Sequence, residues 1–292
     1  MSTQNTPAMA DHTDLRLAPT ADDDWDHDQI VLLDPDHPGF NDQEYRARRN
    51  QIARLSLGYR RGEQIPTAPY TADEHDVWRV VWEALKPAHE KYACAEYVRS
   101  VDKLSLPADR IPQLSEVSDR VEGISGFRLE PVAGLVAPKT FLEALASGTF
   151  LCTQYIRHHS TPFYTPEPDV IHELAGHAVT LACPRLAELN RSFGEAVKRT
   201  KSVEAFDRLS RVYWFTIEFG VLMEDNNLKA YGAGLLSSAG ELGAMSNAEL
   251  RPLNLDAASQ QNYDPTQYQK VLYCAESFEA MARMLDDYLA KW

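Results

Sequence analysis

The stretch Thr165-Pro-Glu-Pro-Asp-Val-Ile-His172-Glu-Leu-Ala-Gly-His177 carries more information about fold and chemistry than any other part of this 292-residue chain. It places two histidines on one short, mostly apolar segment. A carboxylate follows further along the chain, in Trp214-Phe-Thr-Ile-Glu218-Phe-Gly220. Two histidines and one carboxylate are the ligands of a non-haem iron(II) site, where they occupy one face of the metal and leave the other face open to oxygen and substrate. The sequence therefore predicts a metal site made of His172, His177 and Glu218.

The spacing of the two histidines distinguishes this segment from the zinc protease motif HExxH. In that motif both imidazoles stand on one face of an α-helix, one turn apart. His172 and His177 are five residues apart, a spacing that turns their side chains about 140° from one another on an ideal α-helix. We therefore expect the helix to end or widen near Gly176, since glycine tolerates an unusual backbone. A zinc hydrolase with Glu173 as general base is the chemical alternative.

Glu218 strengthens the metal interpretation. It lies in an almost wholly apolar segment, where a charged glutamate is costly unless it is paired or bound to a metal. The alternative for an isolated histidine pair is two ordinary core residues satisfied by hydrogen bonds, because short motifs produce false matches. A third ligand of the right chemistry makes that alternative weaker.

Composition and charge exclude several classes of function. The net charge is -14, whereas a nucleic-acid or anionic membrane surface attracts basic proteins. The chain has no apolar stretch of about eighteen residues, and its N-terminus shows no basic region followed by an apolar one, so we expect neither a transmembrane helix nor a secretory signal. Its four cysteines form no CxxC pair, which argues against a zinc cluster or a disulfide framework and favours buried thiols. We expect a cytoplasmic protein that binds neither nucleic acid nor membrane.

The pattern of apolar residues predicts one mostly α domain with a few short β-strands. Residues 1–30 are polar and acidic and are expected to form a disordered tail, while residues 31–292 form the domain. Thr71 and Glu74 make a capping box that opens a helix, and Pro87 should kink or end that helix. Further helices are expected at 42–57, 138–148, 168–181, 185–198, 203–220 and 277–291, strands at 127–134 and 150–156, and a glycine-rich loop at 229–238.

Several ordered blocks of the sequence resemble the pterin-dependent aromatic amino acid hydroxylases. The likeness extends from about residue 36 to residue 290, which is the catalytic domain of that family, and within the family it is greatest to the phenylalanine hydroxylases. The blocks are Asp36-His-Pro-Gly-Phe40, Tyr45-Arg-Ala-Arg-Arg49, Cys152-Thr-Gln-Tyr-Ile-Arg-His158, Tyr164 to Leu174, Tyr213 to Gly220, Lys229-Ala-Tyr-Gly-Ala-Gly-Leu-Leu-Ser-Ser238 and Ala275-Glu-Ser-Phe278.

The resemblance implies cofactors and roles. The family uses iron(II), tetrahydrobiopterin and O2 to hydroxylate the ring of an aromatic amino acid, and the likeness makes His172, His177 and Glu218 the iron ligands. Arg157 would grip the substrate carboxylate with two parallel hydrogen bonds. The other implied substrate contacts are Thr165, Pro168, Trp214, Phe219 and Ser237. The implied pterin contacts are Gly134, Leu135, Val136, Phe141 and Glu173. The residues implied to support these binding residues are Asp169, Tyr213 and Tyr45, the last of them on a mobile loop.

The identity of residue 214 bears on the substrate. By resemblance, Trp214 is typical of phenylalanine and tyrosine hydroxylases, so we expect conversion of L-phenylalanine to tyrosine. Meta-hydroxylation of phenylalanine and 5-hydroxylation of tryptophan remain alternatives within the family. A zinc-dependent hydrolase and a non-catalytic amino-acid-binding relative remain alternatives of other classes. The chain shows no regulatory domain before the blocks and ends at Trp292, which leads us to expect a monomer.

Overall fold

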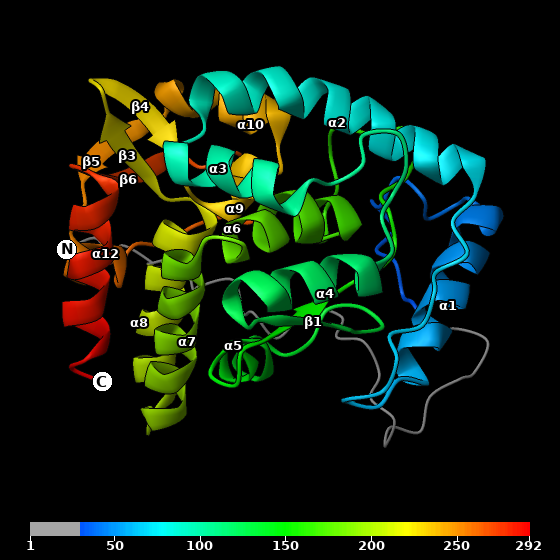
Figure 1. Ribbon diagram of the computed structural model, residues 1–292, viewed down its shortest axis with the longest axis horizontal. Coiled ribbons are helices and arrows are strands. Elements are labelled where there is room, and N and C mark those ends of the chain that lie inside the picture. Colours follow the sequence, from blue (N-terminus) through cyan, green and yellow to red (C-terminus); the bar gives the residue numbers. More distant parts are fainter. Residues whose placement is uncertain (1–29) are drawn as a thin grey trace, which may run out of the picture.

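Helices dominate the protein, as a computed structural model describes it for residues 30–292 (Figure 1). The long helix α2, Ala72–Tyr92, crosses one side of the molecule; α1, Gln43–Leu57, lies near one of its ends and a small sheet lies near the other (Figure 1). The mostly α fold expected from the sequence is confirmed. The expected acidic tail, residues 1–30, falls outside the described residues except for Ile30, which is buried.

The helices begin where polar side chains satisfy free backbone N–H groups. Asp42 accepts a hydrogen bond at the start of α1, and the capping box of Thr71 and Glu74 opens α2 as predicted. Ser202 and Ser277 cap two later helices. The remaining α-helices are α3 Ala95–Leu104, α4 Leu114–Ser125, α5 Pro138–Leu145, α6 Val179–Leu181, α7 Pro184–Arg199, α8 Val203–Tyr213, α9 Ala233–Leu236, α10 Ala239–Ala244, α11 Leu255–Ala258 and α12 Phe278–Leu289.

Pro87 does not end its helix, contrary to one of the two outcomes predicted for it. It lies inside α2, which continues to Tyr92. Proline removes the hydrogen bond to the carbonyl four residues earlier, which belongs here to Glu83. Both Pro87 and Glu83 are exposed, so water can satisfy that carbonyl and the helix continues.

Two groups of strands complete the fold, and the larger one was not predicted. Strands β1, Arg128–Pro131, and β2, Thr149–Cys152, pair in parallel and are shorter than expected. A four-stranded sheet has the order β4-β3-β6-β5. Its strands are β3 Val221–Glu224, β4 Asn227–Ala230, β5 Glu249–Pro252 and β6 Val271–Ala275. Within the expected loop at 229–238 the chain instead completes β4 and forms α9.

Two π-helices lie at the centre of the fold. The helix expected at 168–181 is a π-helix, η2, from His172 to Ala178, followed by α6. The helix expected at 203–220 is α8 followed by a second π-helix, η3, from Trp214 to Glu218. A short 3-10 turn, η4, spans Met245–Asn247. Apart from His172, the residues of η2 are buried, so the packed interior surrounds it.

Candidate metal and substrate site

The wide turn of η2 brings the two histidines of the sequence motif together. A π-helix closes hydrogen bonds between residues five apart, so side chains at that spacing stand nearly above one another. The Nε2 atoms of His172 and His177 are 3.0 Å apart. The expectation that the helix widens is therefore confirmed, and the spacing that excluded HExxH is the spacing that this backbone requires.

Gly176 is needed for close packing rather than for an unusual backbone conformation, which was the role expected from the sequence. Its backbone does not have a positive φ, unlike that of Gly62, Gly126 and Gly148. A Cβ added there would lie 2.7 Å from the carbonyl oxygen of Ala233. The missing side chain thus allows α9 to pack directly against η2, which brings Ser237 at the end of α9 to the metal ligands.

The three predicted ligands converge from two helices. Glu218, at the end of η3, places Oε1 3.0 Å from His177 Nε2 and Oε2 3.9 Å from His172 Nε2. One donor atom from each residue lies within 4.8 Å of the others. Two imidazole nitrogens and a carboxylate oxygen in this arrangement fit a divalent transition metal, with iron(II) as one such ion.

Ser237 fixes the tautomer of His172. Its Oγ lies 3.0 Å from His172 Nδ1 and donates a hydrogen bond to the carbonyl of Gly234 at 3.1 Å. Because that proton is committed to Gly234, Oγ accepts from Nδ1–H, and the lone pair of Nε2 points toward the other ligands. Ser237 was expected as a substrate contact; its position here also makes it the residue that orients a ligand.

The charge pattern of the three ligands favours a cation between them. Burial, and then the nearby His177, lowers the pKa of His172 to about 4, which keeps this imidazole neutral. Burial disfavours ionisation of Glu218, but the two histidines outweigh it and hold its pKa below the usual value. Burial also disfavours the charged form of His177, yet Glu218 raises its pKa overall. Glu218 thus stabilises a positive charge on its neighbour His177, and a bound divalent cation would replace the proton that carries this charge.

A second group of potential metal ligands has a structural explanation. Asp42, His158 and His159 also bring donor atoms within 4.8 Å. His158 Nε2, however, lies 3.1 Å from Asp42 Oδ2, and its Nδ1 lies 2.7 Å from the hydroxyl of Ser160. Asp42 also caps α1 through the N–H of Tyr45. Both ring nitrogens of His158 are thus engaged: Nε2 connects the loop after β2 to the N-cap of α1, and Nδ1 bonds within that loop.

Arg157 and Asp169 meet beside the metal ligands, as the sequence led us to expect. Asp169 accepts hydrogen bonds from Nε and Nη2 of Arg157 at 2.8 and 2.7 Å, and from the backbone N–H of Arg157 at 2.8 Å. It also accepts from the N–H of His172 at 3.2 Å. This pairing uses the Nε edge of the guanidinium. Nη1 donates to the carbonyl of Pro162 at 3.3 Å, so one N–H group on each of Nη1 and Nη2 remains for a carboxylate ligand.

Arg49 was not assigned a role from the sequence. Its side chain is buried and donates to Glu167 at 2.8 Å, while its guanidinium carbon lies 3.3 Å from the ring centre of Tyr155. Tyr155 itself donates to the carbonyl of Pro168. Arg49 thus supports the turn that precedes η2. The sequence feature that could have indicated this role is the position of Arg49 in the block Tyr45-Arg-Ala-Arg-Arg49, which resembles the family.

Two of the residues expected to bind the substrate ring belong to η3 or follow it directly. The rings of Trp214 and Phe219 have centres 4.6 Å apart. Pro168 is half-buried at the start of the segment that leads into η2. Thr165 uses its hydroxyl within its own turn, where it donates to the carbonyl of Glu167 at 2.7 Å. Its expected contact with substrate therefore stays a prediction.

The aromatic residue expected to stack on the pterin is connected to His177 through one other ring. Phe141 of α5 packs edge-on against Phe150, with ring centres 5.2 Å apart, and Phe150 packs against His177 at 4.5 Å. Tyr213 packs edge-on against Phe141 at 6.1 Å and donates to Asn190 at 3.1 Å. Phe150 was not singled out in the sequence, although it alone contacts both Phe141 and His177 among the ring contacts of the described residues.

Glu173 is a buried carboxyl beside this aromatic group. Thr153 donates to its Oε1 through both its N–H and its hydroxyl, at 3.1 and 3.0 Å. Burial raises the pKa of Glu173 to about 7 against the opposing effects of His177 and Thr153. The expected pterin turn, Gly134 to Val136, links β1 to α5, with Gly134 buried and the next two residues half-buried. A half-exposed aromatic face and a buried carboxyl fit a flat ring that carries N–H donors.

Tyr45 lies in the first turn of α1 rather than on a loop. Its hydroxyl donates to the carbonyl of Ile156 at 3.1 Å and accepts from Arg49 at 3.2 Å. Its ring packs edge-on against His158, with centres 4.9 Å apart. These contacts tie Tyr45 to the residue before Arg157, so its support of the site runs through the loop after β2.

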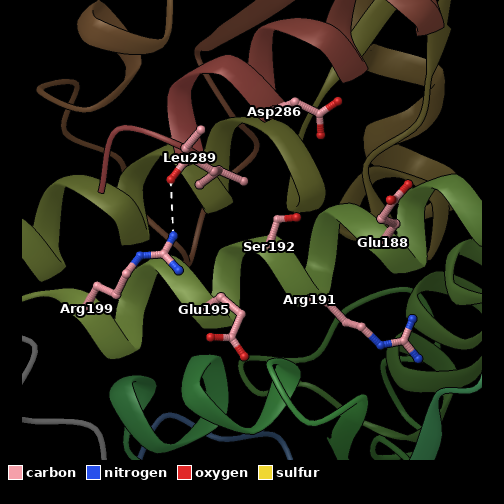
Figure 2. Close-up of a pocket in the computed structure, with 8 residues that line it drawn as sticks. Glu188, Arg191, Ser192, Glu195, Arg199, Asp286 and Leu289 are labelled. Atoms are coloured by element: carbon pink, nitrogen blue, oxygen red, sulfur yellow. Dashed lines mark hydrogen bonds between the residues drawn. The ribbon is translucent and has the colours of Figure 1, made fainter.

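A separate surface groove lies between α7 and α12 and is lined by different residues from the candidate site. Figure 2 shows charged side chains of both signs along it, and Arg199 donates to the carbonyl of Leu289 at 3.4 Å. Its lining residues include Glu188, Arg191, Glu195 and Asp286, and none of the candidate site residues.

Among the described helices, none is long and apolar enough to cross a membrane.

Comparison with known proteins agrees with this geometry. The family model described as biopterin-dependent aromatic amino acid hydroxylase matches residues 26–292. The tyrosine 3-monooxygenase of Schistosoma mansoni is 44% identical over 263 residues, covering 88% of this chain and 56% of that protein. The human phenylalanine-4-hydroxylase is 44% identical over 252 residues, covering 84% of this chain and 56% of that protein. The chain thus spans little more than half the length of these relatives.

Solved structures give the same result. The phenylalanine hydroxylase of Chromobacterium violaceum with bound Fe(III) has a TM-score of 0.73 and 26% identity, covering 82% of this chain and 90% of that chain. The structure of that enzyme with iron(III) and 7,8-dihydrobiopterin has a TM-score of 0.72 at the same identity and coverage. With a family match over nearly its whole length, this chain belongs to the biopterin-dependent aromatic amino acid hydroxylases.

Proposed function

We propose that this protein is an iron(II)- and tetrahydrobiopterin-dependent monooxygenase that hydroxylates the ring of L-phenylalanine to give tyrosine. The observation that carries the proposal is the convergence of His172, His177 and Glu218 on one point, next to an arginine that keeps one N–H group on each of its two terminal nitrogens. Family membership supplies the cofactors. Bound together, iron and tetrahydrobiopterin supply the electrons that split O2, so that one oxygen atom enters the substrate ring.

Arg157 anchors the amino acid. Its Nη1 and Nη2 donate to the substrate carboxylate, while Asp169 holds the opposite edge and keeps the guanidinium in place. Because Asp169 also accepts from the N–H of His172, the anchor and the metal ligands share one rigid connection. The distance between substrate carboxylate and metal is set by the backbone from Arg157 to His172.

Trp214, Phe219 and Pro168 form the walls against which the substrate ring lies. Phe141 stacks on the pterin, and Glu173 accepts hydrogen bonds from its N–H groups. The turn from Gly134 to Val136 contacts the pterin through its backbone, and the aromatic packing around Phe150 excludes water from that side of His177. Each of these roles is assigned through the family likeness. Phe219, Phe150, Gly134 and Glu173 are buried, and the other residues are half-buried.

Phenylalanine is favoured over tryptophan because the bulky indole of Trp214 narrows the space for a two-ring side chain. The relatives named above include both a phenylalanine-4-hydroxylase and a tyrosine 3-monooxygenase, so tyrosine is the second substrate to test. The name of the phenylalanine-4-hydroxylase favours attack at the para position.

The test is direct. Purified protein is loaded with iron(II) and incubated with tetrahydrobiopterin, O2 and each of phenylalanine, tyrosine and tryptophan, and products are identified by mass spectrometry against authentic ring isomers. We expect para-tyrosine from phenylalanine, no turnover by His177→Ala, and normal turnover by His159→Ala, an exposed histidine outside the triad. Formation of no hydroxylated amino acid by the wild type would refute the proposal, and meta-tyrosine would refute the ring position.

A further inference from the structure

Trp214 is held on three sides by its neighbours. Its indole stacks on the ring of Tyr263, with centres 4.0 Å apart and an interplanar angle of 12°. Phe219 lies against it at 4.6 Å. Its Nε1–H donates to Oε1 of Gln269 at 3.0 Å. A tryptophan fixed by two ring contacts and one hydrogen bond has little freedom about its side-chain torsions.

The side chain of Gln269 can hold only one orientation. Its Nε2 donates to the backbone carbonyls of Asp264 and Gln267 at 3.2 and 3.1 Å. Two carbonyl acceptors on one end of the amide require the nitrogen there. Oε1 is therefore the atom that faces Trp214, and an amide flip would break all three hydrogen bonds.

The C-terminal end of the segment from Tyr263 to Gln269 contacts α10. The backbone N–H of Gln269 donates to Oε1 of Glu241 at 2.7 Å, and Glu241 is only 9% exposed. The hydroxyl of Tyr268 lies over Gly240, where an added Cβ would be 2.2 Å from it. Residues 264–268 are exposed, so the position of Gln269 depends on this attachment rather than on core packing.

We propose that Gln269 and Glu241 are positioning residues that fix the indole of Trp214 and thereby make the ring pocket discriminate against a two-ring substrate. This proposal deepens the proposed function and rests on Trp214 being a wall of the ring pocket. With the anchor in place, the indole cannot swing aside to admit a second indole. Without it, the pocket widens and the preference for a single ring falls.

The two residues act at different distances from the indole, which gives the proposal internal controls. Gln269→Leu removes the acceptor for Nε1 and both amide donors. Glu241→Ala removes the acceptor for the Gln269 N–H, whereas Glu241→Gln keeps an oxygen there. Gln267→Leu makes the same chemical change as Gln269→Leu at an exposed neighbour.

The first measurement is the ratio of kcat/KM for L-phenylalanine to kcat/KM for L-tryptophan. We expect Gln269→Leu to lower this ratio roughly tenfold, the scale on which pocket size discriminates between apolar groups. Glu241→Ala lowers it by less, Glu241→Gln stays within about twofold of the wild type, and Gln267→Leu leaves it unchanged. Thermal unfolding midpoints identify any variant that has lost its fold.

The second measurement needs no turnover. The Trp214 contribution to the near-ultraviolet circular dichroism is the difference between wild type and Trp214→Phe, and an immobilised, stacked indole makes it strong. We expect Gln269→Leu and Glu241→Ala to lose most of this signal and Glu241→Gln to keep it. Should the wild type hydroxylate no aromatic amino acid, the proposed function fails while this comparison still decides the positioning role.

The proposal is wrong if Gln269→Leu keeps both the substrate ratio and the circular-dichroism signal of the wild type. It is wrong for Glu241 if Glu241→Gln behaves like Glu241→Ala, because the hydrogen bond to Gln269 would then not be the connection.

Discussion

Arg157 and Asp169 form a buried two-point ion pair, with side chains that are 5% and 0% exposed. An unpaired buried charge is costly, so each residue requires the other. Asp169 accepts further hydrogen bonds from two backbone N–H groups, and despite complete burial these donors and Arg157 hold its pKa below the usual value. The pair is therefore charged throughout the physiological range and gives the site a fixed cation.

Arg157→Lys should weaken amino acid binding without affecting the metal. A lysine ammonium keeps the charge but cannot pair with Asp169 along one edge and a ligand carboxylate along the other. Loss of one charge-assisted hydrogen bond corresponds to roughly 10- to 100-fold in affinity. Calorimetric titration with L-phenylalanine measures the change, and Arg185→Lys on the surface of α7 serves as the control. Equal affinity in Arg157→Lys and wild type would contradict the assignment of this anchor.

Ser237→Ala should lower the affinity for iron(II). The substitution removes the acceptor that holds the Nδ1 proton of His172, and loss of such a supporting contact typically costs 10- to 100-fold in metal affinity. Competition with a chelator measures the dissociation constant. Ser238→Ala is the matched control, because Ser238 caps α10 instead. If both variants bind iron like the wild type, Ser237 does not orient the ligand.

Gly176→Ala and Gly123→Ala should change stability in opposite directions. At Gly176 the new methyl group meets the carbonyl of Ala233 at 2.7 Å, so overpacking should cost about 1–3 kcal/mol in the free energy of unfolding. At Gly123, inside α4, nothing lies within 4 Å of the added Cβ, and alanine should stabilise the helix by about 0.5–1 kcal/mol. Urea unfolding of both variants provides the comparison, and a neutral Gly176→Ala would show that α9 is free to move.

Glu241→Gln should stabilise the protein at neutral and alkaline pH but not in acid. Burial raises the pKa of Glu241 to about 7 from a reference of 4.5. Between these values the folded state holds a proton that the unfolded state has released, so stability present below pH 4.5 falls as the pH rises toward 7. Glutamine escapes this loss, which amounts to at most about 3 kcal/mol. Unfolding midpoints of the two proteins should coincide near pH 4.5 and separate by pH 8; parallel curves would exclude this titration.

The sequence contained enough to place the ligands but not the contacts behind them. His172, His177 and Glu218 stand out because their chemistry is rare in apolar segments, and Arg157 stands out through family likeness. Ser237 was assigned to the substrate, whereas its closest partner is His172, since a hydroxyl at the end of a short helix gives no sign of which group it faces. Its role became visible only when α9 was packed against η2.

The four-stranded sheet and the anchor of Trp214 were missed for a related reason. Each strand is four or five residues long, too short for an alternating pattern to exceed chance, and β3 pairs with β6 across a long stretch of chain. Gln269 lies among exposed polar residues and resembles loop sequence. Its importance comes from partners such as Glu241 that are distant in the chain, and one sequence does not reveal such pairs.

The two π-helices have a consequence for how the metal site comes into being. A π-turn is less favourable than an α-turn in isolation, so neither ligand-bearing segment holds its shape alone. A free peptide covering residues 165–181 would relax to ordinary helical pitch and its imidazoles would turn apart. The metal site therefore forms late in folding, through the same burial that forms the core. A bound ion in turn stabilises the two π-helices that carry its ligands.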